Sequence, residues 1–185
     1  MRLASFLRHV RMPPTTAGVR LHSSVAAAAA AQLATLSAAD VLEAQAKRGQ
    51  LDPAIAPLWR PIHICGPAFT VRQAQGDNLA LHHALVEARA GDVLVVEVIG
   101  EQPCCRALMG DIIAHAAQLR GIAGLVTNGA VRDWDKLHEL SFPVFCAGLN
   151  INGPAKALEG ERCVEISIGE AMSLHACVLF SHGNF

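Results

Sequence analysis

The stretch Val93-Leu94-Val95-Val96-Glu97-Val98-Ile99 decides the fold class of this sequence. It is an almost unbroken run of β-branched and aliphatic residues, which is typical of a strand buried on both faces of a parallel sheet. The turn signal Gly91-Asp92 comes directly before it. Helical patterns lie on both sides, one over about 78–89 and one over 104–119. The sequence around this run therefore predicts a strand between two helices.

The alternation of strands and helices continues from residue 62 to residue 147, which predicts a single α/β domain. We expect further strands over 62–71, with a turn or bulge at Gly66-Pro67, and over 122–127, 144–147 and 163–168. We expect further helices over 37–48 and 133–140.

The composition excludes several classes of protein. The chain has 185 residues, of which 52% are hydrophobic and 17% charged, so it can bury a core and does not resemble a disordered chain. Its formal net charge of −1 gives no overall positive field for nucleic acid or an anionic membrane surface. No apolar stretch approaches the roughly 20 residues that span a bilayer. We expect neither nucleic acid nor membrane as a partner.

The first 24 residues differ from the rest of the chain. They contain Arg2, Arg8, Arg11 and Arg20, and the first acidic residue of the chain is Asp40. An arginine-rich opening without acids is typical of a mitochondrial transit peptide. The alternative is an untargeted tail on a cytoplasmic protein. We therefore expect a transit peptide or tail over 1–24 and one domain over 25–185.

The six cysteines show no CxxC spacing and no zinc signature, so we interpret them as reduced, mostly buried thiols. The Cys104-Cys105 pair lies near the candidate site in sequence. The cysteines are Cys65, Cys104, Cys105, Cys146, Cys163 and Cys177.

The polar residues that carry chemistry fall in two segments, Gly110-Asp111-Ile112-Ile113 and Asn128–Asp133. Asp111 lies in an otherwise apolar helical pattern, and a half-buried carboxylate needs an arginine or a metal ion as its partner. Arg132 and Asp133 follow a strand and a glycine turn, where loops gather catalytic groups. A 2-oxo acid fits such a site, because its carboxylate and ketone oxygens together chelate a hard cation such as Mg²⁺ or Mn²⁺.

Each residue of the candidate site has an expected role in such chemistry. Asp133 would hold the metal, and Arg132 would bind the substrate and stabilise an enolate oxygen. Backbone N–H groups of residues 110–113 would receive the substrate carboxylate if they lie at a helix start. A metal-bound water oriented by Asp111 would act as the base. The alternative is that Arg132 and Asp133 form only a surface ion pair.

The sequence resembles the regulator of ribonuclease activity A family, which includes the 4-hydroxy-4-methyl-2-oxoglutarate aldolases. The resemblance runs from about Ser37 to Ile168 and includes the family's aldolase pattern, an Asp, twenty residues and Arg-Asp, at Asp111, Arg132 and Asp133. The five blocks that carry it, in order, are 66–71, 76–78, 90–96, 110–113 and 129–133.

The resemblance implies a swivelling ββα sandwich and a homotrimer or hexamer with its site between subunits. It implies a divalent-metal-dependent lyase that cleaves 4-hydroxy-4-methyl-2-oxoglutarate-type substrates to pyruvate and decarboxylates oxaloacetate. Asp133 would be the metal residue, Arg132 and Asp111 the catalytic residues, and Gly110, Asp111, Ile112 and Ile113 the substrate loop together with Arg132. The alternative is a non-catalytic regulator that binds a ribonuclease. Asp133 favours the enzyme, since regulators can lack it.

Three positions depart from the family pattern. Lys136 stands where many aldolase relatives have an acid, and His175-Ala176-Cys177 replaces the usual Pro-Gly-Asp. The chain also stops at Phe185, before the final strand of its relatives, which indicates a truncated or divergent C-terminus.

Several other polar or aromatic residues are weaker candidates for the site. His82 and His83 face different directions on a helix, so we do not expect both to bind one metal. His115 is interpreted as a polar or interface residue and Trp134 as a packing residue, with a role beside the site as the alternative for each. Glu97 is unusual in a buried strand, where it would hydrogen-bond within the site or to a structural partner.

Overall fold

The computed structural model describes residues 28, 30–101, 104–168, 171–173 and 177–182. The transit peptide expected over 1–24 lies outside these residues, as do His175 and Ala176 of the altered C-terminal motif. Strands and helices alternate through the described chain, so the expected α/β fold class is confirmed.

The run that opened the sequence analysis forms β3 (Val93–Ile99), at the centre of the main sheet. The strand order is β1-β7-β5-β3-β2-β12, with β9 paired to the far end of β2. The four strands β2, β3, β5 and β7 are parallel to one another, whereas β1 is antiparallel to β7, and β9 and β12 are antiparallel to β2. The bounds of the other strands are β1 (Ala56–Pro57), β2 (Ile62–Ala74), β5 (Gly124–Thr127), β7 (Val144–Cys146), β9 (Glu161–Arg162) and β12 (Cys177–His182).

Strand β3 is buried on both faces, as its sequence predicts. Leu94 and Val96 pack in the core cluster that holds the apolar faces of the helices. Val93 and Val95 point to the opposite face and pack in a second cluster. That cluster includes Ile166 from β10 (Ile166–Ile168), which pairs with β11 (Ala171–Ser173). The alternation follows from the period of two along a strand.

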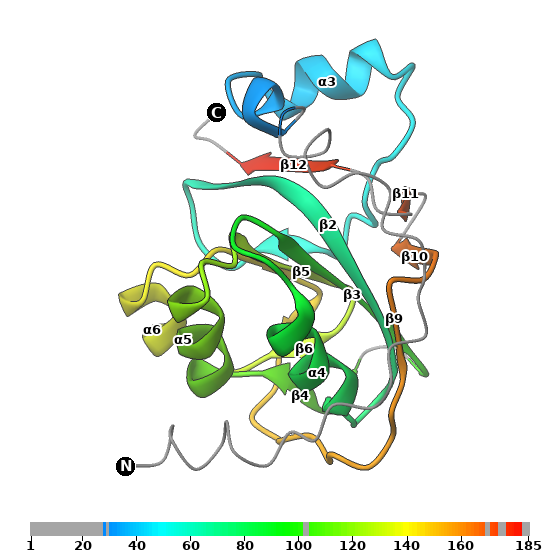
Figure 1. The fold of residues 1–185 in the computed structure, drawn as a ribbon, viewed down its shortest axis with the longest axis vertical. Helices are drawn as coiled ribbons and strands as arrows, with labels where there is room; N and C mark the ends of the chain where they lie inside the picture. The colour runs from blue at the N-terminus through cyan, green and yellow to red at the C-terminus, as the bar shows by residue number, and fades with distance from the viewer. Residues whose placement is uncertain (1–27, 29, 102–103, 169–170, 174–176, 183–185) are drawn as a thin grey trace.

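Three helices lie on one side of the main sheet, and α3 (Ala38–Ala44) lies beside β12 at the opposite end of the molecule (Figure 1). The three helices α4, α5 and α6 each contribute buried residues to the larger core cluster. No helix of the described chain is long and apolar enough to cross a membrane. The three helices on this side of the main sheet are α4 (Leu79–Glu87), α5 (Asp111–Leu119) and α6 (Trp134–Glu139).

A small parallel sheet carries the segments of interest. It consists of β4 (Ala107–Met109), β6 (Ala130–Val131) and β8 (Gly148–Leu149), in that order. The helix expected over 104–119 was therefore wrong in its first part. The short apolar run at 107–109 fits a helix and a strand equally well by pattern, and pairing with β6 decides for the strand.

Two other elements differ in detail from what the sequence predicts. The helix expected over 37–48 ends at Ala44, with the Ser37 hydroxyl accepting a hydrogen bond from Ala39 N at its start. Strand β2 continues through Gly66-Pro67 without a turn. Gly66 is needed there for close packing, since a Cβ would lie 2.2 Å from the carbonyl oxygen of Gly91.

Candidate functional site

Two neighbouring strands of the small sheet end at the candidate site. Strand β4 runs into Gly110 and the start of α5, and β6 runs into Arg132 and Asp133. The strands are parallel, and Arg132 N extends their pairing by donating to Met109 O at 3.0 Å. Because the carboxyl ends of parallel strands meet at one edge of a sheet, Asp111 comes next to the Arg132-Asp133 pair despite the distance in sequence.

The Asp133 carboxylate ties the two segments together. Its Oδ2 accepts a hydrogen bond from Asp111 N at 3.3 Å and lies 3.2 Å from Arg132 Nε. Asp133 has φ +59°, a left-handed conformation that aspartate adopts more readily than most residues. The Arg132 and Asp133 side chains are 38% and 36% exposed, so water screens their attraction and the pair adds little stability. The contact instead holds the Arg132 guanidinium and the Asp133 carboxylate next to each other at the candidate site.

Gly110 makes this close arrangement fit. A Cβ on Gly110 would lie 2.3 Å from Asp133 Oδ2 and 2.9 Å from Arg132 Nε, distances that real Cβ contacts essentially never show. The family resemblance places Gly110 in the expected substrate loop. The geometry gives a physical reason for a glycine, because any side chain here would displace the carboxylate or the guanidinium.

A concave pocket of about 180 Å³ opens beside these residues. It contains all four members of the expected substrate loop and Arg132, together with residues from α4 and from the segment after β8. Asp133 touches Arg132 and Asp111 but does not itself line this pocket. The lining residues are Asn78, His82, Leu108, Met109, Gly110, Asp111, Ile112, Ile113, Arg132, Pro154 and Lys156.

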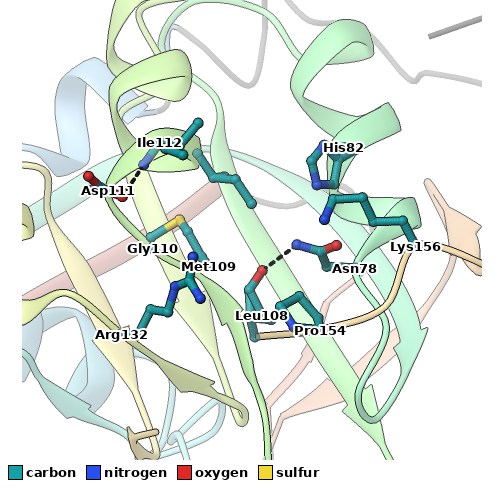
Figure 2. A pocket seen from close by; sticks show the side chains of 11 residues that line it. Asn78, His82, Leu108, Met109, Gly110, Asp111, Ile112, Arg132, Pro154 and Lys156 are labelled. Carbon is teal, nitrogen blue, oxygen red and sulfur yellow. Dashed lines mark hydrogen bonds between the residues drawn. The ribbon is translucent and has the colours of Figure 1, made fainter. Parts of the chain in front are cut away.

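The charged side chains of the pocket lie on opposite walls. Figure 2 shows Arg132 on one side, with His82 and Lys156 pointing inward from the other. Burial lowers the pKa of His82 to about 4, and the charge of Lys156 acts in the same direction. His82 is therefore neutral at neutral pH, and the positive charge of the pocket belongs to Arg132 and Lys156.

Two backbone N–H groups at the start of α5 already donate hydrogen bonds to carboxylates of the protein. Asp111 N donates to the Asp133 carboxylate, and Ile112 N donates to Asp111 Oδ1 at 2.8 Å. From the sequence, N–H groups of this segment are expected to receive a substrate carboxylate. A ligand that binds to these two groups must therefore displace a carboxylate of the protein.

Sequence reasoning missed Asn78, His82 and Lys156 as lining residues. The Asn78 side chain is 1% exposed and donates from Nδ2 to Leu108 O at 2.8 Å. Asn78 lies directly before α4, and its side chain makes no cap hydrogen bond to that helix. Lys156 lies in a segment without a pattern in the sequence. Only the folding of that segment back onto residues 76–78 places it at the site.

Three residues that were weighed as site residues lie outside the pocket. His115 is exposed on α5, as the polar-residue interpretation expected. Trp134 donates from Nε1 to Leu58 O at 2.9 Å and stacks on the ring of His138, but it is 44% exposed. Glu97 pairs with Arg72 at 2.8 Å, which supports the structural interpretation.

Cys104 and Cys105, near the site in sequence, line a different cavity. Its volume is about 690 Å³, and Asn128 and residues 147–150 also line it. The side-chain amide of Asn128 accepts a hydrogen bond from Val98 N and donates one to Val98 O. The cysteine pair is therefore separate from the Arg132 pocket.

The carboxylates beside Arg132 are those of Asp111 and Asp133, and carboxylate oxygens are ligands that Mg²⁺ prefers. In the part of the chain that the structure describes, no cluster of three or more His, Cys, Asp or Glu side chains is placed to hold a metal. Mg²⁺ needs no such cluster, because it usually binds one or two carboxylates and keeps several waters. Asp133 is a half-exposed carboxylate in a cradle that a Cβ on Gly110 would fill. The Asp133 carboxylate therefore fits the role expected for it.

Comparisons with known proteins place this geometry in a family. Residues 35–182 match the family model described as RraA-like, aldolase/RraA. A protein of Halalkalibacterium halodurans named putative 4-hydroxy-4-methyl-2-oxoglutarate aldolase is 43% identical over 119 residues, 64% of this chain. The matched region spans 56% of that relative's length.

Two solved structures share the fold. The RNA-processing inhibitor RraA from Thermus thermophilis has a TM-score of 0.70 and 26% identity, over 79% of this chain and 88% of that one. A protein from Geobacillus kaustophilus, described as S-adenosylmethionine: 2-dimethylmenaquinone methyltransferase, has a TM-score of 0.70 and 27% identity, over 79% and 90%. The family model covers most of the chain and the structures repeat its fold, so this chain belongs to the RraA-like family of aldolase/RraA proteins.

Proposed function

We propose that this chain is a divalent-metal-dependent lyase that cleaves 4-hydroxy-4-methyl-2-oxoglutarate-type substrates to pyruvate and also decarboxylates oxaloacetate. One observation carries the proposal: the Arg132 guanidinium and the Asp133 carboxylate are held together against Gly110 beside a small pocket. The relative from Halalkalibacterium halodurans bears the name of such an aldolase.

The size of the pocket agrees with a small acid. Drug-sized ligands occupy pockets of roughly 300–1,000 Å³, and this one holds about 180 Å³. A 2-oxo acid is small enough for that space, and a nucleoside-containing cosubstrate is larger than it. The methyltransferase description of the Geobacillus kaustophilus protein therefore gains no support from this pocket.

The proposed cleavage breaks the bond between C3 and C4 of the substrate. The C4 hydroxyl loses its proton to a water that Asp111 holds, and C4 becomes the ketone carbon of the first pyruvate. The electron pair of the broken bond moves toward C3 and the C2 carbonyl, which gives the enolate of the second pyruvate. Arg132 stabilises the enolate oxygen by a charge-assisted hydrogen bond. The proton taken from the C4 hydroxyl then returns to C3, which completes the second pyruvate and leaves Asp111 and its water as they began.

Asp133 would hold the divalent cation, Mg²⁺ or Mn²⁺. When bound, such a cation supplies Lewis acidity to the ketone oxygen of the substrate. Arg132 binds the substrate beside it, and the apolar side chains of Met109, Ile112 and Ile113 limit water on that wall of the pocket.

The test is the metal-dependent release of pyruvate. Purified protein is incubated with 4-hydroxy-4-methyl-2-oxoglutarate or oxaloacetate, with magnesium or with a chelator, and pyruvate is followed. Turnover that needs the metal and is lost in Arg132→Gln supports the proposal. Arg120→Gln, which neutralises an exposed arginine after α5, is the matched control and should keep full activity. Folded protein without turnover on either acid would contradict the proposal.

A second candidate function is protein binding without catalysis, as in a ribonuclease regulator. Leu149 and Ile151 are 58% and 90% exposed, and apolar side chains of this kind often mark protein contacts. We propose a homotrimer or hexamer that uses this surface, with a ribonuclease as the alternative partner. Light scattering on the wild type and on Ile151→Ser distinguishes the two. A monomeric wild type that still binds a ribonuclease would favour the regulator.

A further inference from the structure

The adjacent cysteines Cys104 and Cys105 form a motif of the sequence that the proposed reaction does not use. Both are free thiols, and both line the cavity of about 690 Å³ that is separate from the Arg132 pocket. A cavity of this size has room for small solutes as well as water, since a single water needs only about 15 Å³. Two thiols that are neighbours in the chain are therefore within reach of small reactive molecules.

The two thiols differ in exposure and in their hydrogen bonds. Cys105 is exposed, and its Sγ accepts a hydrogen bond from Gln75 Nε2 at 3.4 Å. Cys104 is 8% exposed, packs in the larger core cluster and donates from Sγ to Arg106 O at 3.0 Å. Oxidants reach an exposed thiol first, and a neighbouring thiol then resolves the product. The structure therefore assigns the first step to Cys105 and the second to Cys104.

A disulfide between neighbouring residues is closed at the expense of strain, which makes it easy to reduce again. Adjacent Cα atoms are about 3.8 Å apart, whereas ordinary disulfides join Cα atoms about 4.4–6.8 Å apart. Strained disulfides are the labile ones, which serve as reversible rather than structural bonds. Cys104 and Cys105 belong to no helix or strand, so regular backbone pairing does not oppose the adjustment that ring closure requires.

We propose that Cys104 and Cys105 are a reversible oxidation site, with a peroxide as oxidant and a small thiol as reductant. The Cys105 thiolate attacks hydrogen peroxide, so that an S–O bond forms, the O–O bond breaks and hydroxide leaves as water after taking the thiol proton. The Cys104 sulfur then attacks the Cys105 sulfur. The S–S bond forms, the S–O bond breaks, and the second hydroxide leaves as water with the Cys104 proton. Two molecules of a small thiol reverse the change and become a disulfide themselves.

Mass spectrometry of the full chain after treatment with dilute hydrogen peroxide tests the proposal. Trypsin cleavage after Arg89 and Arg106 releases the peptide 90–106, whose cysteines are Cys104 and Cys105. After oxidation and alkylation without reductant, this peptide should carry no alkyl group and be about 2 Da lighter than the reduced peptide, because two hydrogen atoms are lost. Dithiothreitol before alkylation should restore both alkyl groups. In untreated protein, a brief pulse of alkylating reagent should label Cys105 before Cys104.

Cys104→Ser removes the second thiol, so peroxide should leave a sulfenic acid on Cys105 that dimedone labels several-fold more than in the wild type. Cys65→Ser is the matched control, because it removes a half-buried thiol on β2 that donates to Ala30 O, and the light peptide should form as in the wild type. Two alkyl groups on the wild-type peptide after peroxide would overturn the proposal. Sulfinic acid on Cys105 as the main product, or equal dimedone labelling of wild type and Cys104→Ser, would overturn it as well.

Discussion

Gly110 and Asp133 approach so closely that the site depends on the absence of a side chain: a Cβ on Gly110 would stand 2.3 Å from Asp133 Oδ2. Gly110 directly follows β4, and Asp133 comes two residues after the end of β6, so the contact joins the ends of two neighbouring strands. The first prediction tests this relationship.

Gly110→Ala should lower activity at least 10-fold and stability by about 1–3 kcal/mol, the usual range for overpacking. The added methyl group meets the end of the Asp133 side chain, which can rotate away, so the fold survives while the carboxylate moves. Pyruvate release and thermal unfolding measure the two effects. Gly148→Ala is the matched control, because a Cβ there meets no atom within 4 Å. Equal activity of the two variants would show that the close contact is unimportant.

Asp133→Asn should reduce the rate about 100-fold or more with little change in stability. Asparagine also tolerates the left-handed conformation at φ +59°, so the backbone is kept while the negative charge is lost. The exposed ion pair with Arg132 contributes about 1 kcal/mol or less. Steady-state kinetics and urea unfolding check the prediction. Wild-type activity in this variant would remove Asp133 from the site.

Asp77→Asn should destabilise the protein by about 1–3 kcal/mol at pH 7, since it weakens three hydrogen bonds from backbone N–H groups. Burial alone would raise the pKa of Asp77, but these hydrogen bonds, with help from Lys156, lower it below its ordinary value. A lowered carboxyl pKa stabilises the fold above the unfolded pKa, and this stabilisation disappears as the pH falls through the folded pKa.

The difference between wild type and Asp77→Asn should therefore shrink on acidification. Chemical unfolding at pH 7 and at successively lower pH measures it. Asp52→Asn is the control, because the exposed Asp52 accepts a single N–H from Ala54. If the difference in unfolding free energy between wild type and Asp77→Asn stayed the same at every pH, the charge of the carboxylate would not contribute to stability.

His82 should make the fold sensitive to mild acid. Its pKa is lowered from 6.5 to about 4, first by burial and then by the charge of Lys156. The unfolded chain then binds the proton more tightly, so stability is lost as the pH falls from about 6.5 to 4 and changes no further below that. The loss amounts to roughly 3 kcal/mol at about 1.4 kcal/mol for each pH unit.

An NMR titration of the His82 ring measures the pKa directly, and His82→Gln should flatten the pH dependence of stability over the same range. A His82 ring that titrates near the ordinary histidine pKa of 6.5 would contradict the prediction.

The elements that the sequence predicted well are those whose residues all favour one structure. The run Val93–Ile99 formed β3 with the expected bounds, because only a strand buried on both faces explains it. Residues 107–109 were assigned to a helix, since three apolar residues carry no period. The partner that makes them a strand is β6, and that pairing between distant segments is invisible in the local pattern.

The candidate site likewise contains residues that the sequence predicted and residues that it did not. Asp111 and Arg132 line the pocket as expected, and Asp133 contacts both, because the segments follow two neighbouring parallel strands. Lys156 was not anticipated, since its position depends on backbone hydrogen bonds to residues 76–78 rather than on a motif. The transit peptide, the native metal and the homotrimer stay predictions.

A crystal structure with manganese and pyruvate tests the central claim most directly. The account predicts an anomalous peak beside the Asp133 carboxylate, with pyruvate next to it and the Arg132 guanidinium in contact with pyruvate. Manganese bound elsewhere, with Arg132 turned to solvent and no pyruvate in the pocket, would contradict it.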